Sequence, residues 1–139
     1  MAERRLLLDS TLDSVEVAEA AVLKDAKSLG FHEDDLHQLG MAVRESMVNA
    51  VVHGNRYNAR KKVHVSVTKA PDRLTIVIAD EGEGFDPKTV PDPLAEENLL
   101  RQSGRGLLMM QAFVDEFEVR CCQPRGTEVR MVKYLAKAS

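Results

Sequence analysis

The sequence has no tryptophan and few aromatic or cysteine residues, and these shortages exclude several kinds of protein. Aromatic residues make up 4% of the 139 residues, too few for a surface that stacks the bases of single-stranded nucleic acid. The formal net charge of -3 also argues against a general nucleic-acid binder, which is normally basic. Cys121 and Cys122, the two cysteines, are adjacent, so they suit neither a disulfide nor a zinc site.

Long apolar runs are also missing from the sequence. No run is long enough to span a bilayer, and the first residues, with three leucines before Asp9, do not resemble a secretory signal. The contents of hydrophobic (44%) and charged (29%) residues are ordinary for a globular protein. We therefore expect one cytoplasmic domain over residues 1–139, with reduced thiols and no direct contact with membrane or nucleic acid.

The spacing of apolar residues predicts a mixture of helices and antiparallel strands. The expected strands cover residues 4–8, 62–68, 74–79, 116–122 and 127–135. The expected helices run from the polar residues at 10–13 to Gly30, from 33 to about 54, and over 107–114. This order indicates an α+β fold: a two-layer sandwich of a mixed, mostly antiparallel sheet with about three helices on one face.

Residues 41–55 predict a helix that is apolar on nearly every side. Glu45, Asn49 and His53 follow one another at intervals of four, and about 3.6 residues per turn would place them on one face. An unpaired polar group buried in such a helix costs on the order of 2–7 kcal/mol. A polar network within the protein or a bound ligand with a metal ion would satisfy these side chains, and the helix alone leaves both open.

Two glycine-containing turns suit the binding of a nucleotide. Asp80 ends a predicted buried strand, where a carboxylate can accept a hydrogen bond from the amine of a base, and the DEGEG glycines let backbone approach a flat ring. Gly104 and Gly106 precede a predicted helix, whose first N–H groups suit phosphate oxygens, and Arg105 between them adds charge. Each turn alone is common, and neither matches a P-loop or a dinucleotide fingerprint.

The helix residues acquire roles beside such a ligand. Asn49 offers a neutral oxygen to Mg²⁺, and Glu45, one turn before it, can orient or deprotonate an attacking hydroxyl or water. His53 is either a satisfied histidine at a helix end or part of the same site. Thr127 is either an ordinary strand residue or a hydroxyl that reaches a bound ring.

Taken together and in this order, these motifs resemble the GHKL ATPase superfamily, which includes gyrase, heat-shock chaperone and histidine-kinase ATP sites. E-x-x-x-N at Glu45 is similar to the N box, DEGEGF from Asp80 to the first glycine box, and SGRGL from Ser103 to the second. The flanking words AVRESMVNAVVHGN and SGRGLLMMQAFVDEFEV are similar to the small bacterial anti-sigma factor serine kinases. Asn55 departs from that branch, in which an aromatic residue is frequent at this position.

The resemblance implies a fold of the Bergerat type with ATP and Mg²⁺ between helices and sheet. It implies that Glu45 is the catalytic base, that Asn49 holds Mg²⁺ and that Asp80 binds the adenine amine. Residues 86–103 match the ATP lid. The remaining nucleotide-binding residues that it implies are His53, Gly82, Gly84, Phe85, Gly104, Arg105, Gly106, Leu107 and Thr127.

The resemblance also implies partners and leaves alternatives. Kinases of this branch bind a sigma factor, often as homodimers, and phosphorylate a serine of an anti-anti-sigma protein. A binding module that holds ATP and a partner without phosphotransfer is the first alternative, and the intact Glu45 favours the enzyme. A detached histidine-kinase catalytic domain ranks lower, because His32 and His37 lack the preceding helix pair that such a kinase needs.

Overall fold

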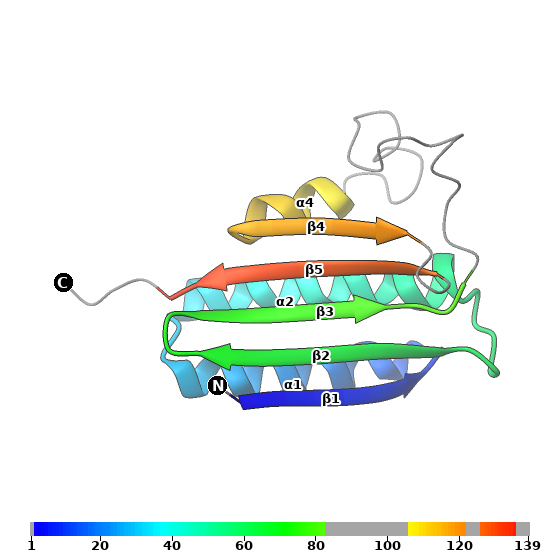
Figure 1. The fold of residues 1–139 in the computed structure, drawn as a ribbon, viewed down its shortest axis with the longest axis horizontal. Coiled ribbons are helices and arrows are strands. Elements are labelled where there is room, and N and C mark those ends of the chain that lie inside the picture. The colour runs from blue at the N-terminus through cyan, green and yellow to red at the C-terminus, as the bar shows by residue number, and fades with distance from the viewer. Residues whose placement is uncertain (1, 83–105, 122–125, 136–139) are drawn as a thin grey trace.

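The computed structural model describes residues 2–82, 106–121 and 126–135 (Figure 1). Four of the predicted site residues (Gly84, Phe85, Gly104 and Arg105) and the predicted lid over 86–103 lie outside these ranges. In chain order the elements are β1 (Ala2–Asp9), α1 (Asp13–Leu29), α2 (Glu33–Val48), the π-helix η1 (Asn49–Gly54), β2 (Lys62–Ala70), β3 (Arg73–Ala79), α4 (Gly106–Phe113), β4 (Glu116–Cys121) and β5 (Thr127–Tyr134).

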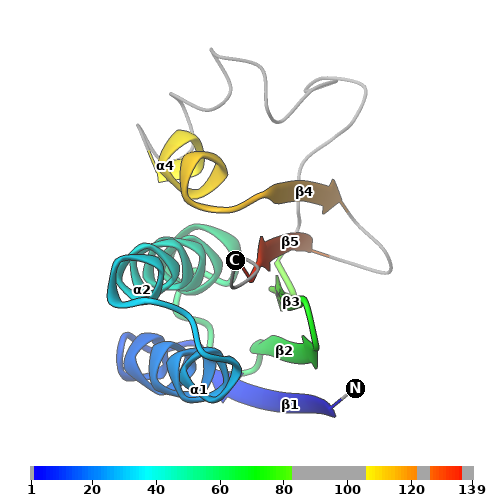
Figure 2. The same ribbon diagram turned by 90° about the vertical axis from the view of Figure 1, so that its left-hand side faces the viewer.

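The strands form one five-stranded sheet in the order β1-β2-β3-β5-β4, and each neighbouring pair in this described sheet is antiparallel. Helices α1, α2 and α4 cover one face of the sheet, as Figure 2 shows from the side. The predicted fold class, an α+β sandwich with about three helices on one face, is confirmed. Within the described ranges, no helix is both long enough and apolar enough to cross a membrane.

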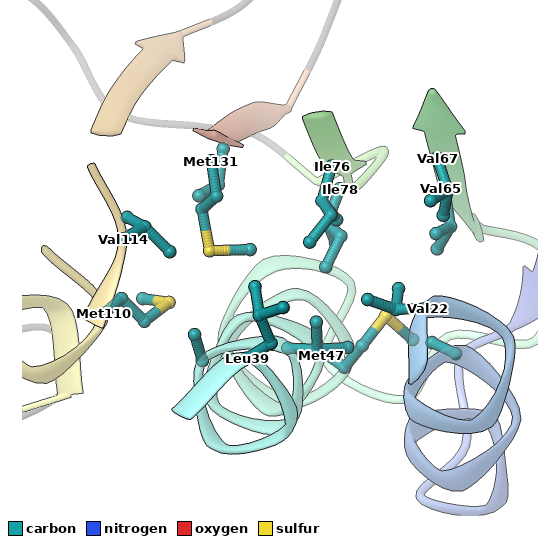
Figure 3. Packing of buried hydrophobic residues seen from close by; sticks show 14 of the residues in the cluster. Val22, Leu39, Met47, Val65, Val67, Ile76, Ile78, Met110, Val114 and Met131 are labelled. Atoms are coloured by element: carbon teal, nitrogen blue, oxygen red, sulfur yellow. The ribbon is translucent and has the colours of Figure 1, made fainter. Parts of the chain in front are cut away.

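The core lies between the sheet and these helices, and its residues follow the two periodicities of the sequence. Alternate residues of β2 and β3 point to the helices, and every third or fourth residue of α1 and α2 points back (Figure 3). The most deeply buried side chains include Val63, Val65, Leu74, Ile76, Ile78, Val22, Leu39, Val43, Met47 and Met131. This apolar layer fixes the sheet against α2 and so positions the last turns of α2 near the ends of the strands.

The predicted helix over 33–54 changes its type at Asn49. It is α-helical only to Val48 and continues as a π-helix from Asn49 to Gly54, with the N–H of Asn55 donating to Ala50 O at 2.8 Å. A π-helix places an extra residue in each turn, so residues four apart no longer stack exactly as in an α-helix. The prediction of one continuous α-helix was therefore wrong over its last six residues. Such segments are rare and occur frequently at functional sites.

Candidate functional site

Asp80 is a buried carboxylate that backbone groups hold in place directly after β3. Only 7% of the residue is exposed, and its Oδ1 accepts N–H groups from Gly82 at 2.9 Å and from Thr127 at 3.1 Å. The N–H of Asp80 donates in turn to Thr127 O at 3.0 Å. Burial raises the pKa of Asp80, although the two N–H bonds oppose that shift. No described residue donates to Oδ2, so this oxygen is left to accept a hydrogen bond from a ligand.

Three glycines surround this carboxylate at distances that leave no space for a side chain. A Cβ on Gly54 would lie 2.2 Å from Asp80 Oδ2, and one on Gly126, whose φ is 87°, would lie 2.2 Å from Asp80 O. A Cβ on Gly82 would lie 2.2 Å from Gly54 O. The sequence predicts Gly82 for the approach of a ligand ring; the structure adds that Gly82 lets the end of η1 approach the β3 turn.

Asn55 is a buried residue of this site that the sequence analysis did not assign to it. It is 1% exposed, and it bonds to Ser10, Lys62 and the N–H of Glu81. The carboxylate of Glu81 bonds instead to His64 Nε2 at 2.6 Å, and this hydrogen bond keeps the pKa of Glu81 below its usual value. The sequence analysis noted Asn55 only as a departure from the branch that the motifs resemble, and it assigned no role to this residue.

Asn49, the first residue of η1, has a buried amide oxygen without a partner. Its Oδ1 and the hydroxyl of Ser46 are the two buried side-chain polar atoms in the described part of the chain that lack a hydrogen bond. An unsatisfied buried polar group costs about 1–3 kcal/mol, so the orphaned oxygen indicates a partner that binds from outside. An amide oxygen is a ligand that Mg²⁺ accepts, and Asn49 therefore fits the predicted role.

The described residues contain no group of three or more His, Cys, Asp or Glu side chains that would hold a metal ion by themselves. Mg²⁺ usually keeps several waters and binds through one or two protein groups together with substrate phosphates. A cation at Asn49 would consequently need a phosphate-bearing ligand to complete its oxygen shell.

Glu45 and His53 lie on either side of Asn49 in the chain and differ in exposure. Glu45, in the last turns of α2, is half-buried, and no described residue donates to its carboxylate. His53 is exposed near the end of η1. Glu45 and Asn49 are both half-buried and are joined by an α-helical bond from the N–H of Asn49 to Glu45 O, whereas His53 lies beyond the start of the π-helix and is exposed. The α-helical spacing predicts one shared environment for all three side chains, and His53 does not follow it. The roles of Glu45 and His53 stay predictions.

The structure brings Asp80, Gly82 and Thr127 together, and η1 connects them to Asn49. Gly106 and Leu107 begin α4, which lies beside α2 in Figures 1 and 2. Because the other members of both glycine turns lie outside the described residues, the phosphate-binding role of the second turn stays a prediction.

Comparisons with known proteins found a matching family model and several similar proteins. The family model described as "Histidine kinase-like ATPase domain" matches residues 8–133. The anti-sigma F factor of Bacillus subtilis is 33% identical over 107 residues, covering 76% of this chain and 73% of its own length. The anti-sigma F factor of Oceanobacillus iheyensis is 30% identical over 138 residues, covering 98% of this chain and 94% of its own.

Solved structures have the same fold at lower sequence identity. The structure of the RsbU and RsbW domains of Rv1364c from Mycobacterium tuberculosis superposes with a TM-score of 0.68 and 16% identity, covering 100% of this chain and 35% of that one. The mycobacterial sensor histidine kinase MprB superposes with a TM-score of 0.56 and 19% identity, covering 96% of this chain and 97% of that one. At these identities the likeness supports the fold.

Proposed function

The chain belongs to the histidine kinase-like ATPase family, and we propose that it is a Mg²⁺- and ATP-dependent protein kinase that also binds a sigma factor. The observation that carries the proposal is a pair of oxygens at the two ends of one segment to which no described residue donates a hydrogen bond. Asn49 Oδ1 is buried without a partner at the start of η1, and Asp80 Oδ2 lies against Gly54 at its end. An ATP molecule has the matching groups, because its adenine amine donates a hydrogen bond and its phosphates carry Mg²⁺.

Each described residue has a defined part in this proposal. Asp80 accepts the adenine amine, with Gly82 and Thr127 holding the carboxylate by their N–H groups. Asn49 contributes its oxygen to Mg²⁺, which neutralises charge on the phosphates when it is bound. Glu45 orients the acceptor hydroxyl and takes its proton.

The residues outside the described ranges, and three others, have proposed roles as well. The start of α4 at Gly106 and Leu107, with Gly104 and Arg105 before it, holds the phosphates through N–H groups and charge. We assign to nucleotide binding also Gly84, Phe85 and His53.

The partners follow from the names of the relatives and from the resemblance. Two relatives with at least 30% identity are named anti-sigma F factor, so a sigma factor is the proposed first partner. A small anti-anti-sigma protein is the proposed substrate, with a serine as the acceptor. A homodimer in the cytoplasm is the proposed state of the protein.

The proposal is tested by measuring ATP binding and phosphate transfer separately. Calorimetry with and without Mg²⁺ gives the affinity, and ATP labelled on its γ-phosphate gives the transfer to candidate anti-anti-sigma proteins. Failure to bind ATP would refute the proposal. ATP binding with no labelled protein in the presence of a cognate partner would favour a binding module without phosphotransfer, and label on a histidine would favour a histidine-kinase catalytic domain.

Glu45→Ala is the sharpest single change for the enzyme. We expect transfer to fall by about 10²- to 10⁴-fold, the usual contribution of a general base, while ATP affinity changes less than about threefold. Glu33→Ala, an exposed glutamate at the start of the same helix, is the matched control and should transfer at the parental rate. Transfer by Glu45→Ala at the parental rate would remove Glu45 from the catalytic role.

A further inference from the structure

Asn55 uses almost all the hydrogen-bonding capacity of its side chain at one place in the fold. Its Nδ2 donates to Ser10 Oγ at 2.9 Å and to Lys62 O at 3.0 Å, and its Oδ1 accepts the N–H of Glu81 at 2.8 Å. The partners fix which end of the amide is which, because a carbonyl needs the N–H₂ end and a backbone N–H needs the oxygen. One buried amide thus connects the end of β1, the start of β2 and the turn after β3.

Asn55 is connected to the backbone on two sides of Asp80. The residue before Asn55 is Gly54, whose Cα lies so close to Asp80 Oδ2 that a Cβ would be 2.2 Å away. The residue after Asp80 is Glu81, whose N–H is held by Asn55. Asn55 therefore ties the backbone that follows the carboxylate to the backbone that packs against its second oxygen.

No other side chain of this length would make the same set of bonds. Aspartate would lose both donors, leucine would leave the N–H of Glu81 unpaired, and an aromatic ring in the plane of these groups has no amide to offer.

We infer that Asn55 is a positioning residue that sets the preference of the site for adenine over guanine by holding Asp80 in place. The inference rests on the proposed function, in which Asp80 accepts the adenine amine. Adenine presents an N–H₂ donor at its position 6, whereas guanine presents an oxygen acceptor there. A fixed carboxylate accepts the first and repels the second, because the two oxygens would meet without a proton between them.

The preference depends on the carboxylate staying where it is. A carboxylate free to turn or shift can move away from the oxygen of guanine or bind it through a water, and the site then discriminates less. Two N–H bonds to Oδ1 hold one oxygen of Asp80, and the bond from Asn55 to the next peptide restricts the remaining motion of the turn.

The experiment compares Asn55→Ala with Ser10→Ala. Both variants break the Ser10–Asn55 bond of the same buried network, but Ser10→Ala leaves the bond between Asn55 and Glu81 intact. The readout is the ratio of the dissociation constants for GTP and ATP, measured by calorimetry with Mg²⁺ on each folded variant. Thermal unfolding of each variant gives the loss of stability, so that selection is compared between variants of known stability.

We expect Asn55→Ala to reduce the preference for ATP over GTP about tenfold, the effect of one well-placed hydrogen bond, and Ser10→Ala to keep it within about twofold. If Asn55→Ala does not fold, Asn55→Ser serves instead, because its hydroxyl keeps a polar group in the network but is too short to connect Ser10 with Glu81. The same loss of preference is expected.

The outcomes separate this inference from the proposed function. If the unchanged protein does not bind ATP, the proposed function fails first. If it binds ATP with a preference over GTP and Asn55→Ala keeps that preference, the positioning role of Asn55 is wrong while the function stands. If both variants lose the preference in proportion to their stability, Asn55 has only a structural role and the inference is overturned.

Discussion

The interface between helices and sheet and the polar end of the sheet follow opposite principles of construction. In the interface, Leu39, Met47 and Ile76 are fully buried and belong to the hydrophobic core cluster. At the polar end, Asp80 and Asn55 are buried as well, at 7% and 1% exposure, and each is held by hydrogen bonds. Both regions exclude water, but only the second does so with groups that prefer water.

The difference shows which region is built for stability and which for binding. Burying apolar surface stabilises a fold by about 25 cal/mol per Å², so the interface needs no further purpose. Burying Asp80 disfavours its charged form, and the unpartnered oxygen of Asn49 lowers stability. A ligand that supplies the missing partners would reverse both costs, which is why the polar end indicates a site.

The largest effect is expected from a cavity in the interface. Ile76→Ala should lower the free energy of unfolding by about 2–5 kcal/mol, because the fully buried side chain leaves a void in β3. Chemical denaturation measures the loss, and the affinity of the folded fraction for ATP should not change. Val77→Ala, on the opposite face of the same strand, is the control and should cost less. A large loss of ATP affinity in folded Ile76→Ala would contradict the separation of the two regions.

Asn49→Ala tests the polar end, where we expect a loss of ATP binding without a loss of stability. Removing the unpartnered oxygen should leave the free energy of unfolding unchanged or raise it by up to about 1 kcal/mol. ATP affinity in the presence of Mg²⁺ should fall about tenfold, the equivalent of about 1.4 kcal/mol.

Two comparisons make the Asn49 experiment specific. Chelation of Mg²⁺ should make the parent and Asn49→Ala bind ATP with similar affinity. Asn58→Ala, at an exposed asparagine in the loop after η1, should behave as the parent does. Loss of stability together with unchanged Mg²⁺-dependent affinity would place Asn49 in the structural part of the molecule.

Asp80→Asn should change the free energy of unfolding by a smaller amount, and that amount should depend on pH. Burial raises the pKa of Asp80 above its ordinary 3.8, so the folded protein binds this proton more tightly than the unfolded chain does. The contribution of Asp80 to the free energy of unfolding is therefore greatest at low pH and falls as pH rises from about 3.8 through the raised pKa. Asparagine lacks this titration.

Denaturation from pH 3.5 to 7 would reveal the titration as a difference between the two proteins. The stability of Asp80→Asn relative to the parent should increase with pH across that window and then become constant. ATP binding by the variant should be weak at every pH, because the N–H groups of Gly82 and Thr127 would take the amide oxygen and leave the N–H₂ group facing the amine of the base. Parallel stability curves for the parent and the variant would show that Asp80 is not perturbed by burial.

The same division explains how much of the molecule the sequence predicts. The strands and helices were predicted because alternation in β2 and the three- and four-residue spacing in α1 are local signals of burial. Asp80 at the end of β3 was predicted for the same reason. The π-helix was not predicted, because the three- and four-residue spacing of apolar residues indicates a helix without distinguishing the π form from the α form.

The role of Asn55 was beyond the sequence for a related reason. Its hydrogen bonds join residues 45 and 26 positions apart, so no spacing within one element reveals them. Residue type alone is ambiguous too, since asparagine after a glycine at a helix end is also a common turn residue. Local periodicity predicts apolar layers well and polar networks between elements poorly.

Ser46 gives the finest test of the comparison, because it lies where the two regions meet. Its hydroxyl is buried at 2% exposure in α2 without a described partner, three residues before Asn49. If Ser46 belongs to the interface, Ser46→Ala should stabilise the protein by about 1 kcal/mol, since it removes an unpaired hydroxyl and alanine favours helix. Ser14→Ala is the control in α1: that hydroxyl is also buried but lies 3.3 Å from Thr11 Oγ1, so its loss should not stabilise the protein. Both the stability and the ATP affinity of Ser46→Ala should be measured. If the variant gains no stability and binds ATP more weakly, Ser46 belongs to the site, and the polar end begins one turn earlier in the helix.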